Sequence, residues 1–489
     1  MIRGKMRIGG DWVEARSGAA RQVINPFNQE TIATVAEGDR QDARDAIRAA
    51  RLAFDAGPWL PAAGRAGCLA RLAGLVTRQR EELAELETLD TGKTLEESRW
   101  DMNDVAGVFS YYAGLADPWE DEAIETPDAG CSSVLVREPV GVCAQILPWN
   151  YPLLQASWKL GPALAAGCTV VMKPSEITPL TTLRLTELAL EAGVPGGVVN
   201  TVLGPGATVG AELAESAEVD LVSFTGGVAT GKTIMRAAAG NVKRIALELG
   251  GKNPHIVFAD ADLEAALERV LDGVFFHAGQ ICSAGARLML QDEIHDRFVE
   301  ALAARVERIR LGDGREAGTQ MGPLISAEHR AKVERHVAIA MEEGARLLCG
   351  GRRPEAVELA GGFFYLPTLL VDCEDGMRIV QEEVFGPVIS VERFGSEEEV
   401  VRRANGTIYG LSAGFWSQDP ERIQRVARAL RFGTIWVNDF NVYFAQAPWG
   451  GYKQSGIGRE LGRAGLDEYT EIKHLYRSRA PKGQSWFGV

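Results

Sequence analysis

Cys282 is the residue whose type and position most directly suggest covalent chemistry. It lies in the segment 279–283, between a predicted helix over 263–277 and an apolar run at 287–290 that predicts a strand. Turns present side chains that the core of a helix or strand would bury, so this thiol is a candidate nucleophile. A free cysteine is also typical of packed interiors, where it acts as a small hydrophobic residue, so Cys282 alone does not decide between the two.

Polar residues follow four predicted strands at the point where each strand ends. These residues include Asn150, Lys173, Glu176, Thr225 and Glu248. In a doubly wound parallel sheet, ligands bind beyond the carboxyl ends of the strands. We therefore expect these side chains to surround one ligand site.

The octapeptide 226–233 suggests a different chemistry, because it satisfies the G-x-x-x-x-G-K-[ST] pattern of phosphate-binding loops. It follows a predicted strand and opens a helix, where backbone N–H groups bind anions. Asp260, after the apolar run 255–258, could supply a magnesium-binding carboxylate. A P-loop NTPase is thus a rival hypothesis, and a glycine turn that only links a strand to a helix is a third.

The elements that must position these residues alternate between apolar runs and helical patterns from Gly141 onward. Strands are predicted at 142–147, 169–173, 198–203, 221–225, 245–249, 255–258, 287–290, near Leu369, and at 388–391, 412–416 and 434–437. Such alternation predicts parallel strands joined by crossover helices. The fold class we predict is α/β, with a Rossmann-like parallel-sheet domain followed by a second α/β domain.

The predicted domain limits follow from this pattern and from the paired glycines at 250–251. Residues 40–115 are expected to be helical, because leucines repeat at helical spacing, and 132–136 to form a projecting strand. We predict a nucleotide-binding domain at 1–118 and 142–249, a second domain at 250–448, an oligomerisation arm at 119–141 and 469–489, and a return to the first domain at 449–468. The tail, too short for a domain, is expected to pair with another subunit.

Composition limits the classes of partner. A chain of 489 residues exceeds one ordinary core, and a net charge of -14 argues against nucleic acid or an anionic membrane as the main partner. Seven scattered cysteines without a Cys-x-x-Cys pair indicate reduced thiols rather than disulfides or a zinc site. We see no signal-peptide core and no apolar stretch of membrane-spanning length, so a cytoplasmic protein is expected.

Together these segments resemble the NAD(P)-dependent aldehyde dehydrogenase superfamily, in order and with family-like spacing from Asn25 to Gly462. The resemblance implies an enzyme that oxidises an aldehyde to its carboxylic acid through a cysteine thiohemiacetal and thioester. It also makes Lys232 a surface residue of a helix, which sets the NTPase aside. A non-catalytic structural protein on the same fold stays as an alternative, although it would be expected to lack Cys282 or Glu248.

The catalytic roles are implied by that resemblance and fit the chemistry of the residues. Cys282 is the expected nucleophile, and the Asn150 amide and the Cys282 backbone N–H are the expected oxyanion donors. Glu248 is the expected base for the hydrolytic water. Lys159 and Glu460 match residues proposed to relay protons in this branch of the family.

The resemblance also implies an NAD site, with NADP as a second possibility. Glu176 favours NAD, since its carboxylate would repel a 2′-phosphate, although it can swing away. The predicted cofactor residues are Pro148, Trp149, Asn150, Lys173, Ser175, Glu176, Gly206, Phe224, Thr225, Gly226, Gly227, Leu249, Gly250, Glu383 and Phe385.

The carboxy-terminal segment 446–460 is similar to the betaine aldehyde dehydrogenase branch, whose aromatic rings enclose a trimethylammonium group. Tyr151, Trp158 and Trp449 stand at the matching positions, and Gln280 is a further predicted substrate contact. Ring faces suit a quaternary ammonium, which has no N–H to donate. The segment 283–287 departs from the Thr-Asn-Gly-Thr-Arg of many bacterial members, which leaves ω-aminoaldehydes and neutral aliphatic or aromatic aldehydes as alternatives.

The same branch suggests potassium and an oligomer. One predicted ion site uses Asp90 with the backbone carbonyls of Ile24 and Val242, and another lies near Lys453 and Gly456. Asp90 is equally expected to cap its own turn at 90–93. A homodimer or homotetramer is expected, with glycine betaine as the product of betaine aldehyde.

Overall fold

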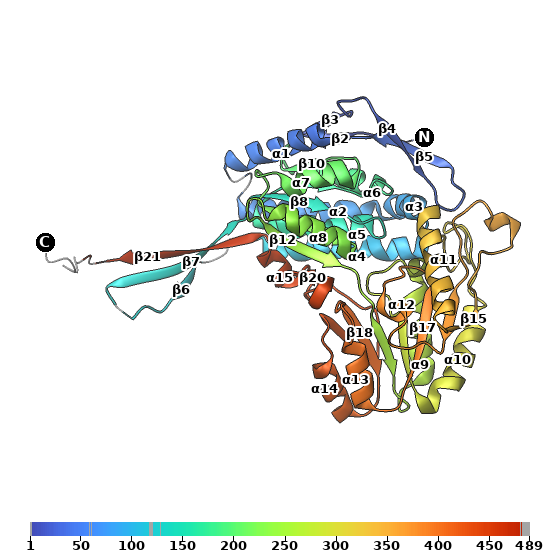
Figure 1. Ribbon diagram of the computed structural model, residues 1–489. Helices are drawn as coiled ribbons and strands as arrows, with labels where there is room; N and C mark the ends of the chain where they lie inside the picture. The colour runs from blue at the N-terminus through green and yellow to red at the C-terminus, as the bar shows by residue number, and fades with distance from the viewer. Residues whose placement is uncertain are drawn as a thin grey trace.

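The computed structural model describes residues 2–57, 59, 61–116, 121–127, 129–479 and 481. Two large sheets with helices against both faces form the body, and a narrow three-stranded sheet extends away from it (Figure 1). Parts of the predicted arm, at 119–120, 128, 480 and 482–489, lie outside the described residues.

The first large sheet has the strand order β20-β12-β11-β8-β9-β10-β2-β3. Its strands are β2 (Met6–Ile8), β3 (Asp11–Val13), β8 (Val142–Ile146), β9 (Thr169–Lys173), β10 (Val199–Thr201), β11 (Leu221–Gly226), β12 (Arg244–Leu249) and β20 (Gly456–Ile457). The five from β12 to β10 are parallel, and the edge strands are antiparallel. The chain runs from β8 to β10 on one side and then continues with β11 and β12 on the other. This reversal between β8 and β11 confirms the predicted Rossmann-like sheet.

Helices bury both faces of this sheet. One face packs on α5 (Pro152–Ala166) and α6 (Leu180–Glu191), and the other on α1 (Arg40–Asp55), α7 (Ala211–Glu215) and α8 (Val228–Ala238). In β8, the Cys143 side chain belongs to the apolar core on the face covered by α5 and α6, whereas Val142 and Ala144 belong to the core on the face covered by α1, α7 and α8. This alternation is the period of two expected for a strand buried on both faces.

The region predicted as helical over 40–115 divides into four helices. After α1 come α2 (Ala62–Arg78), α3 (Arg80–Thr91) and α4 (Leu95–Leu115). Capping boxes begin α1, at Asp39 and Asp42, and α4, at Thr94 and Glu97. Gly92, at φ 81°, ends α3 in the left-handed conformation that glycine adopts without strain. Local sequence therefore sets these breaks.

The second large sheet has the order β15-β16-β17-β14-β13-β18-β19, with only β15 antiparallel. Its strands are β13 (Pro254–Val257), β14 (Arg287–Gln291), β15 (Arg346–Cys349), β16 (Thr368–Val371), β17 (Val388–Phe394), β18 (Ser412–Trp416) and β19 (Thr434–Val437). One face packs on α9 (Leu263–Phe275), α10 (Asp292–Val306), α11 (Ala327–Glu342) and α12 (Arg378–Gln381), and the other on α13 (Glu397–Asn405) and α14 (Pro420–Ala429). The second α/β series is therefore confirmed, although α9 ends before the predicted 277.

The projecting sheet joins β6 (Glu122–Ile124), β7 (Cys131–Pro139) and β21 (Thr470–Ser478). β21 pairs antiparallel with β7 of the same chain along its whole length. One edge of the tail strand thus pairs with this chain's own β7, and the expectation that the tail pairs with another subunit stays a prediction. The outer edge of β21 has no strand partner among the described residues, and Ile472, Leu475 and Tyr476 are exposed there.

A small sheet of β1 (Ile2–Gly4), β5 (Thr31–Ala36) and β4 (Ala20–Ile24) lies beside the first large sheet, and α15 (Gly462–Asp467) leads into β21. Over the residues described above, no helix combines the length and apolar character that crossing a bilayer requires. The division of the strands between the two large sheets is compatible with the predicted domain limits, which stay a prediction.

Candidate active site

A cavity of about 910 Å³ opens at the carboxyl ends of β8, β9, β11 and β12. Cys282, Glu248, Tyr151 and Trp449 line it. All the predicted cofactor residues line it as well: Pro148, Trp149, Asn150, Lys173, Ser175, Glu176, Gly206, Phe224, Thr225, Gly226, Gly227, Leu249, Gly250, Glu383 and Phe385. The fold therefore gathers residues from both α/β series at the topological switch point, where such sheets bind their ligands.

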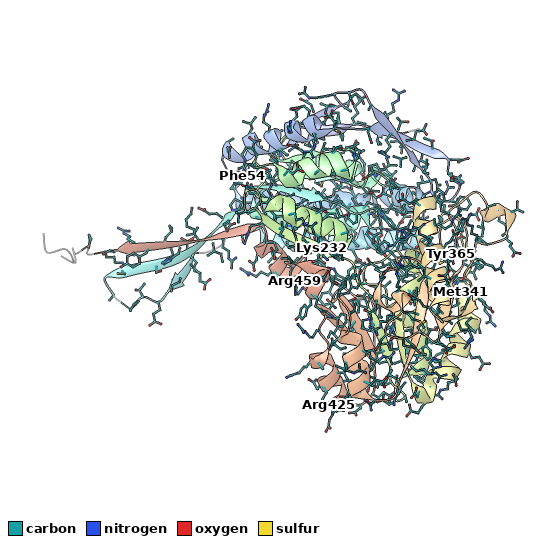
Figure 2. All side chains as sticks on the ribbon, in the orientation of Figure 1. Phe54, Lys232, Met341, Tyr365, Arg425 and Arg459 are labelled. Atoms are coloured by element: carbon teal, nitrogen blue, oxygen red, sulfur yellow. The ribbon has the colours of Figure 1, made fainter. Side chains whose placement is uncertain are left out.

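The alternative phosphate-loop chemistry does not fit this geometry. β11 ends at Gly226 and α8 begins at Val228, so no loop is left to wrap a phosphate. Lys232 projects from α8 (Figure 2), is exposed and does not line the cavity. Asp260 accepts hydrogen bonds from the Ser417 hydroxyl and two backbone N–H groups instead of facing an ion.

Two glycines shape the cavity. A Cβ at Gly227 would meet nothing within 4 Å, which leaves open space for a ligand over the start of α8. A Cβ at Gly250 would lie 2.0 Å from Glu383 Oε2, so only glycine lets that carboxylate approach. Glu383 Oε1 accepts a hydrogen bond from the Gly251 N–H at 3.1 Å, and burial raises the pKa of Glu383 to about 7.

Lys173 and Glu176 form a pair at the far end of the cavity. The Lys173 ammonium donates to the Pro174 carbonyl at 3.0 Å and to Glu176 Oε2 at 3.3 Å. Burial lowers the pKa of Lys173. The pKa of Glu176 is lowered in spite of burial, because the Lys173 ammonium lies beside it. An ammonium and a carboxylate are thus available together for ligand hydroxyl groups.

A strained turn presents Cys282. After α9, the one-turn helix η2 (Phe276–Gly279) ends with His277, Ala278 and Gly279 at φ 47°, 52° and 73°. A left-handed conformation costs a non-glycine residue about 1–3 kcal/mol and persists where the surroundings impose it, commonly at active sites. At Gly279 a Cβ would lie 2.2 Å from the Gly386 carbonyl oxygen, so the chain passes there without a side chain.

Backbone carbonyls of this segment are held by two asparagines. Asn150 Nδ2 donates to the Gln280 carbonyl at 2.8 Å, which fixes the amide and leaves its second N–H available. Asn253, which the sequence analysis missed, donates to the carbonyls of Cys282 at 2.8 Å and Ala284 at 3.0 Å. Its position two residues after the paired glycines was the only sequence signal.

Gln280 does not fit the predicted role as a substrate contact. Its side chain is fully buried and donates to the His277 carbonyl at 3.0 Å, and it accepts from the Ile325 N–H at 2.8 Å. It does not line the cavity. The amide is used inside the turn because a left-handed segment leaves backbone groups that need partners.

The surroundings of Cys282 and Glu248, the predicted nucleophile and base, shift the pKa of both side chains. Burial raises the pKa of the Cys282 thiol, and the carboxylates of Glu383 and Glu248 raise it further. Burial and the Glu460 carboxylate raise the pKa of Glu248, against the Lys159 ammonium. Glu248 Oε2 has no hydrogen-bond partner among the described residues. On the cavity that Glu248 shares with Cys282, this oxygen is the atom of Glu248 that can accept a proton.

Lys159 and Glu460 form a buried ion pair behind Glu248. The Lys159 ammonium contacts Glu460 Oε1 and also donates to Thr225 Oγ1 at 2.7 Å. Thr225 donates in turn to Gln155 at 3.0 Å. Neither Lys159 nor Glu460 lines the cavity, yet both act electrostatically on Glu248. This is an arrangement through which a proton could leave the base.

Aromatic rings cluster next to Cys282. The Trp158 ring packs edge-to-face on Trp449 at 6.1 Å and on Tyr443 at 5.5 Å between centroids. Tyr443, absent from our sequence analysis, also contacts Trp449 at 6.1 Å. The sequence signal for it was weak, namely an aromatic residue six positions before Trp449.

Tyr151 has a different set of neighbours. Its ring packs edge-to-face on His277 at 5.6 Å, and the ammonium of the fully buried Lys93 lies 4.0 Å from its centroid. Lys93 pairs with Asp101 Oδ2 at 2.6 Å. Sequence reasoning missed both charged residues, since Lys93, between α3 and α4, and Asp101, in α4, are far in sequence from the motif segments.

The predicted potassium residues are only partly brought together. Asp90 Oδ2 accepts from the Leu180 N–H at 2.9 Å, so it caps α6 rather than its own turn. Val242 precedes β12 at the amino end of that strand, whereas Leu180 follows the carboxyl end of β9, so Val242 and Asp90 lie at opposite edges of the sheet. The prediction that Val242 and Asp90 of the same chain bind one potassium ion is therefore wrong.

The other predicted ion residues keep their place as predictions. Ile24 ends β4 in the small sheet, and Asp90 Oδ1 is buried without a hydrogen-bond partner among the described residues. The Lys453 ammonium donates to the carbonyls of Asn405 at 3.2 Å and Thr407 at 3.1 Å, and Gly456 pairs with Glu248 across β20 and β12. Among the described residues, no group of three or more acidic, histidine or cysteine side chains forms a metal site.

Comparison with known proteins places this geometry in context. Residues 12–475 match the model of the aldehyde dehydrogenase family. The chain is 63% identical over 482 residues to a betaine aldehyde dehydrogenase of Bacillus subtilis, covering 98% of both chains, and 44% identical to a peroxisomal aminoaldehyde dehydrogenase 2 of Pisum sativum, covering 98% of this chain and 97% of that one. A crystal structure of betaine aldehyde dehydrogenase from Staphylococcus aureus in complex with NAD+ superposes with a TM-score of 0.98 at 55% identity, over 99% of this chain and 96% of that chain.

Proposed function

Because the chain belongs to the aldehyde dehydrogenase family, we propose that it oxidises betaine aldehyde to glycine betaine with NAD as hydride acceptor. The observation that carries this proposal is the single cavity that joins Cys282 and Glu248 with the predicted cofactor residues and an aromatic cluster. Aminoaldehydes, which are also cationic, are the second candidate, since an aminoaldehyde dehydrogenase is 44% identical.

The first half of the reaction uses Cys282, Glu248 and Asn150. The Cys282 thiol gives its proton to Glu248, and the resulting thiolate attacks the aldehyde carbon. The oxyanion that forms takes a hydrogen bond from the free N–H of Asn150, whose other N–H is fixed on Gln280, and from the Cys282 backbone N–H. A donor of this kind contributes about 3–4 kcal/mol to the transition state. NAD, when bound, accepts the hydride that leaves the substrate carbon, and a thioester on Cys282 remains.

In the second half, Glu248 first passes the proton from Cys282 toward Lys159 and Glu460, the buried pair that acts electrostatically on it, and then serves as a base again. It takes a proton from water, and the hydroxide attacks the thioester carbon, which releases the carboxylic acid and the Cys282 thiolate. Glu248 then returns this proton to the Cys282 thiolate, which restores the resting thiol. Net, one aldehyde, one water and one NAD give the acid, NADH and a proton.

The residues of the cavity suit a dinucleotide. Lys173 and Glu176 offer an ammonium and a carboxylate for the adenosine ribose, and Glu383 offers a carboxylate for the nicotinamide ribose. The open space over Gly227 suits a pyrophosphate at the amino end of α8. Because Glu176 keeps a lowered pKa, its negative charge favours NAD over NADP.

The charge of the substrate follows from the rings and the acidic residues near them. Trp158, Trp449 and Tyr443 form an aromatic cluster beside Cys282, and each ring face offers about 0.5–2 kcal/mol to a cation. The Asp101 and Asp104 carboxylates act on Tyr443, where burial and their negative charge raise the pKa of the phenol. A cationic aldehyde gains from both effects, whereas a neutral one does not.

We further propose a cytoplasmic homodimer or homotetramer. The exposed outer edge of β21, with Ile472, Leu475 and Tyr476, supports pairing with a second copy. Potassium near Asp90 stays part of the proposal, because a buried carboxylate oxygen without a partner favours a cation.

The test compares betaine aldehyde with 3,3-dimethylbutanal, in which carbon replaces the quaternary nitrogen. NADH formation is measured at 340 nm for the wild type and for Cys282→Ala. We expect at least about a 10-fold higher kcat/KM for the cation, and no activity in the variant. Equal rates for the two aldehydes would remove the cationic specificity, and absence of NADH formation with every aldehyde would refute the enzymatic function.

A further inference from the structure

The side chain of Glu97 connects the start of α4 with the turn that presents Cys282. Its Oε2 accepts from the Thr94 N–H at 2.7 Å and from Thr94 Oγ1 at 2.8 Å, as in a capping box. Its Oε1 accepts from the His277 backbone N–H at 2.6 Å, across 180 residues of sequence. One carboxylate therefore accepts hydrogen bonds from two backbone segments, at Thr94 and at His277, that are far apart in the sequence.

The bond to His277 is made at a strained turn. His277 and Ala278 are left-handed residues with a Cβ, and Gly279 follows in the same conformation. Nearby, the Gln280 side chain donates to the His277 carbonyl at 3.0 Å. Glu97 and Gln280 thus hold the N–H and the C=O of the same residue, and together they can impose a conformation that the chain would leave if it were free.

The same turn determines the orientation of two reacting groups. Gln280 carries the carbonyl that fixes the Asn150 amide, and Cys282 lies two residues further along. A shift of His277 would therefore move both the predicted nucleophile and the predicted oxyanion donor.

We propose that Glu97 is a positioning residue for catalysis, which acts through its reach to the His277 N–H and not through its charge. This inference rests on the proposed role of Cys282. Burial raises the pKa of Glu97, although two backbone N–H groups bind its carboxylate. The bond to the His277 N–H needs one acceptor oxygen, so a glutamine side chain whose amide oxygen faces that N–H would keep it.

Two substitutions separate reach from charge. Glu97→Gln keeps an oxygen at the same distance and removes the charge, whereas Glu97→Asp keeps the charge and withdraws the carboxylate by about 1.5 Å, one carbon–carbon bond. Thr94→Val is the matched control, because it removes the hydroxyl from the capping box and leaves the bond between Glu97 and His277 intact.

The experiment measures the alkylation rate of Cys282 by iodoacetamide and, in parallel, kcat for NADH formation. Labelling of the other cysteines is subtracted with Cys282→Ala. For Glu97→Asp we expect both rates to fall about 10- to 100-fold, since a misplacement of about 1 Å costs up to about 100-fold. For Glu97→Gln and Thr94→Val we expect both rates within about threefold of the wild type, and NAD affinity unchanged in all three variants.

Three results would overturn the inference. A loss in Glu97→Gln with a normal Glu97→Asp would assign the effect to charge. An equal loss in Thr94→Val would assign it to the start of the helix, and normal rates in Glu97→Asp would show that the turn holds without this contact. Alkylation needs neither aldehyde nor NAD, so these results stay separate from failure of the proposed function, which a wild type without NADH formation would reveal.

Discussion

Removal of the Lys159 ammonium is the perturbation whose consequences the structure defines best. Lys159 is fully buried, Glu460 is 5% exposed, and the two form an ion pair next to Glu248. Lys159→Met keeps the length and volume of the side chain and removes its charge. Glu460 is then left as a buried carboxylate without a counter-ion.

Breaking a buried pair by removing one partner costs about 3–5 kcal/mol of folding free energy. Glu460 can reduce that cost by taking up a proton. Burial already raises the pKa of Glu460 and Lys159 lowers it, so the substitution raises this pKa further. Each pKa unit corresponds to about 1.4 kcal/mol.

The sign of the pH dependence follows from proton uptake. Above the ordinary glutamate pKa of about 4.3, folded Lys159→Met protein holds a proton on Glu460 that the unfolded chain has released. The free energy of unfolding therefore falls as pH rises from about 4.3 through the raised pKa of Glu460. At lower pH the residue is protonated in both states, and the effect disappears.

Thermal and urea unfolding at pH 5.5, 7.0 and 8.5 would measure this effect for the wild type, for Lys159→Met and for the double variant Lys159→Met/Glu460→Gln. We expect the single variant to lose progressively more stability than the wild type toward pH 8.5, and the double variant to recover it. The rising limb of kcat with pH should also move to higher pH, since the Lys159 ammonium lowers the pKa of Glu248. Parallel pH profiles for wild type and single variant, or no recovery in the double variant, would refute the reasoning.

Two further predictions concern the cavity. Gly250→Ala would bring a Cβ to 2.0 Å from Glu383 Oε2, so we expect the KM for NAD to rise at least about 10-fold, whereas Gly107→Ala, with nothing within 4 Å of a Cβ, leaves it unchanged. A normal KM in Gly250→Ala would contradict the placement of Glu383. Tyr443→Leu should lower the preference for betaine aldehyde over 3,3-dimethylbutanal about 2- to 30-fold, with Tyr443→Phe as the control that keeps the ring. An unchanged preference in both variants would exclude Tyr443 from the recognition of the cation.

Local sequence predicted the regular elements well. The strands 169–173, 412–416 and 434–437 were predicted with the limits that the structure has, because a run of β-branched and aromatic residues between turn residues is a local signal. The four strand-ending segments also met at one cavity, since the carboxyl ends of parallel strands share an edge.

Contacts between distant segments were beyond that reasoning. An aspartate such as Asp90 can either cap a helix or bind an ion. Only the fold shows that Asp90 caps α6 by accepting a hydrogen bond from the Leu180 N–H. Gln280 belongs to the nucleophile segment in sequence, yet the left-handed turn rotates its amide into the protein interior. Leu180 and Ile325, which bind these two side chains, come from remote parts of the chain that no local pattern specifies.

By itself, the sequence determined the α/β class, and it predicted Cys282 and Glu248 as nucleophile and base and the strand ends that line the cavity. Residue chemistry and the periods of helices and strands are local properties, so they can be read directly from the sequence. The tertiary structure alone decided the partners: Glu97 on His277, Lys93 on Tyr151, and Lys159 with Glu460. These depend on packing between segments more than 50 residues apart, where burial, and not spacing, sets which charges meet and which side chains are held in place.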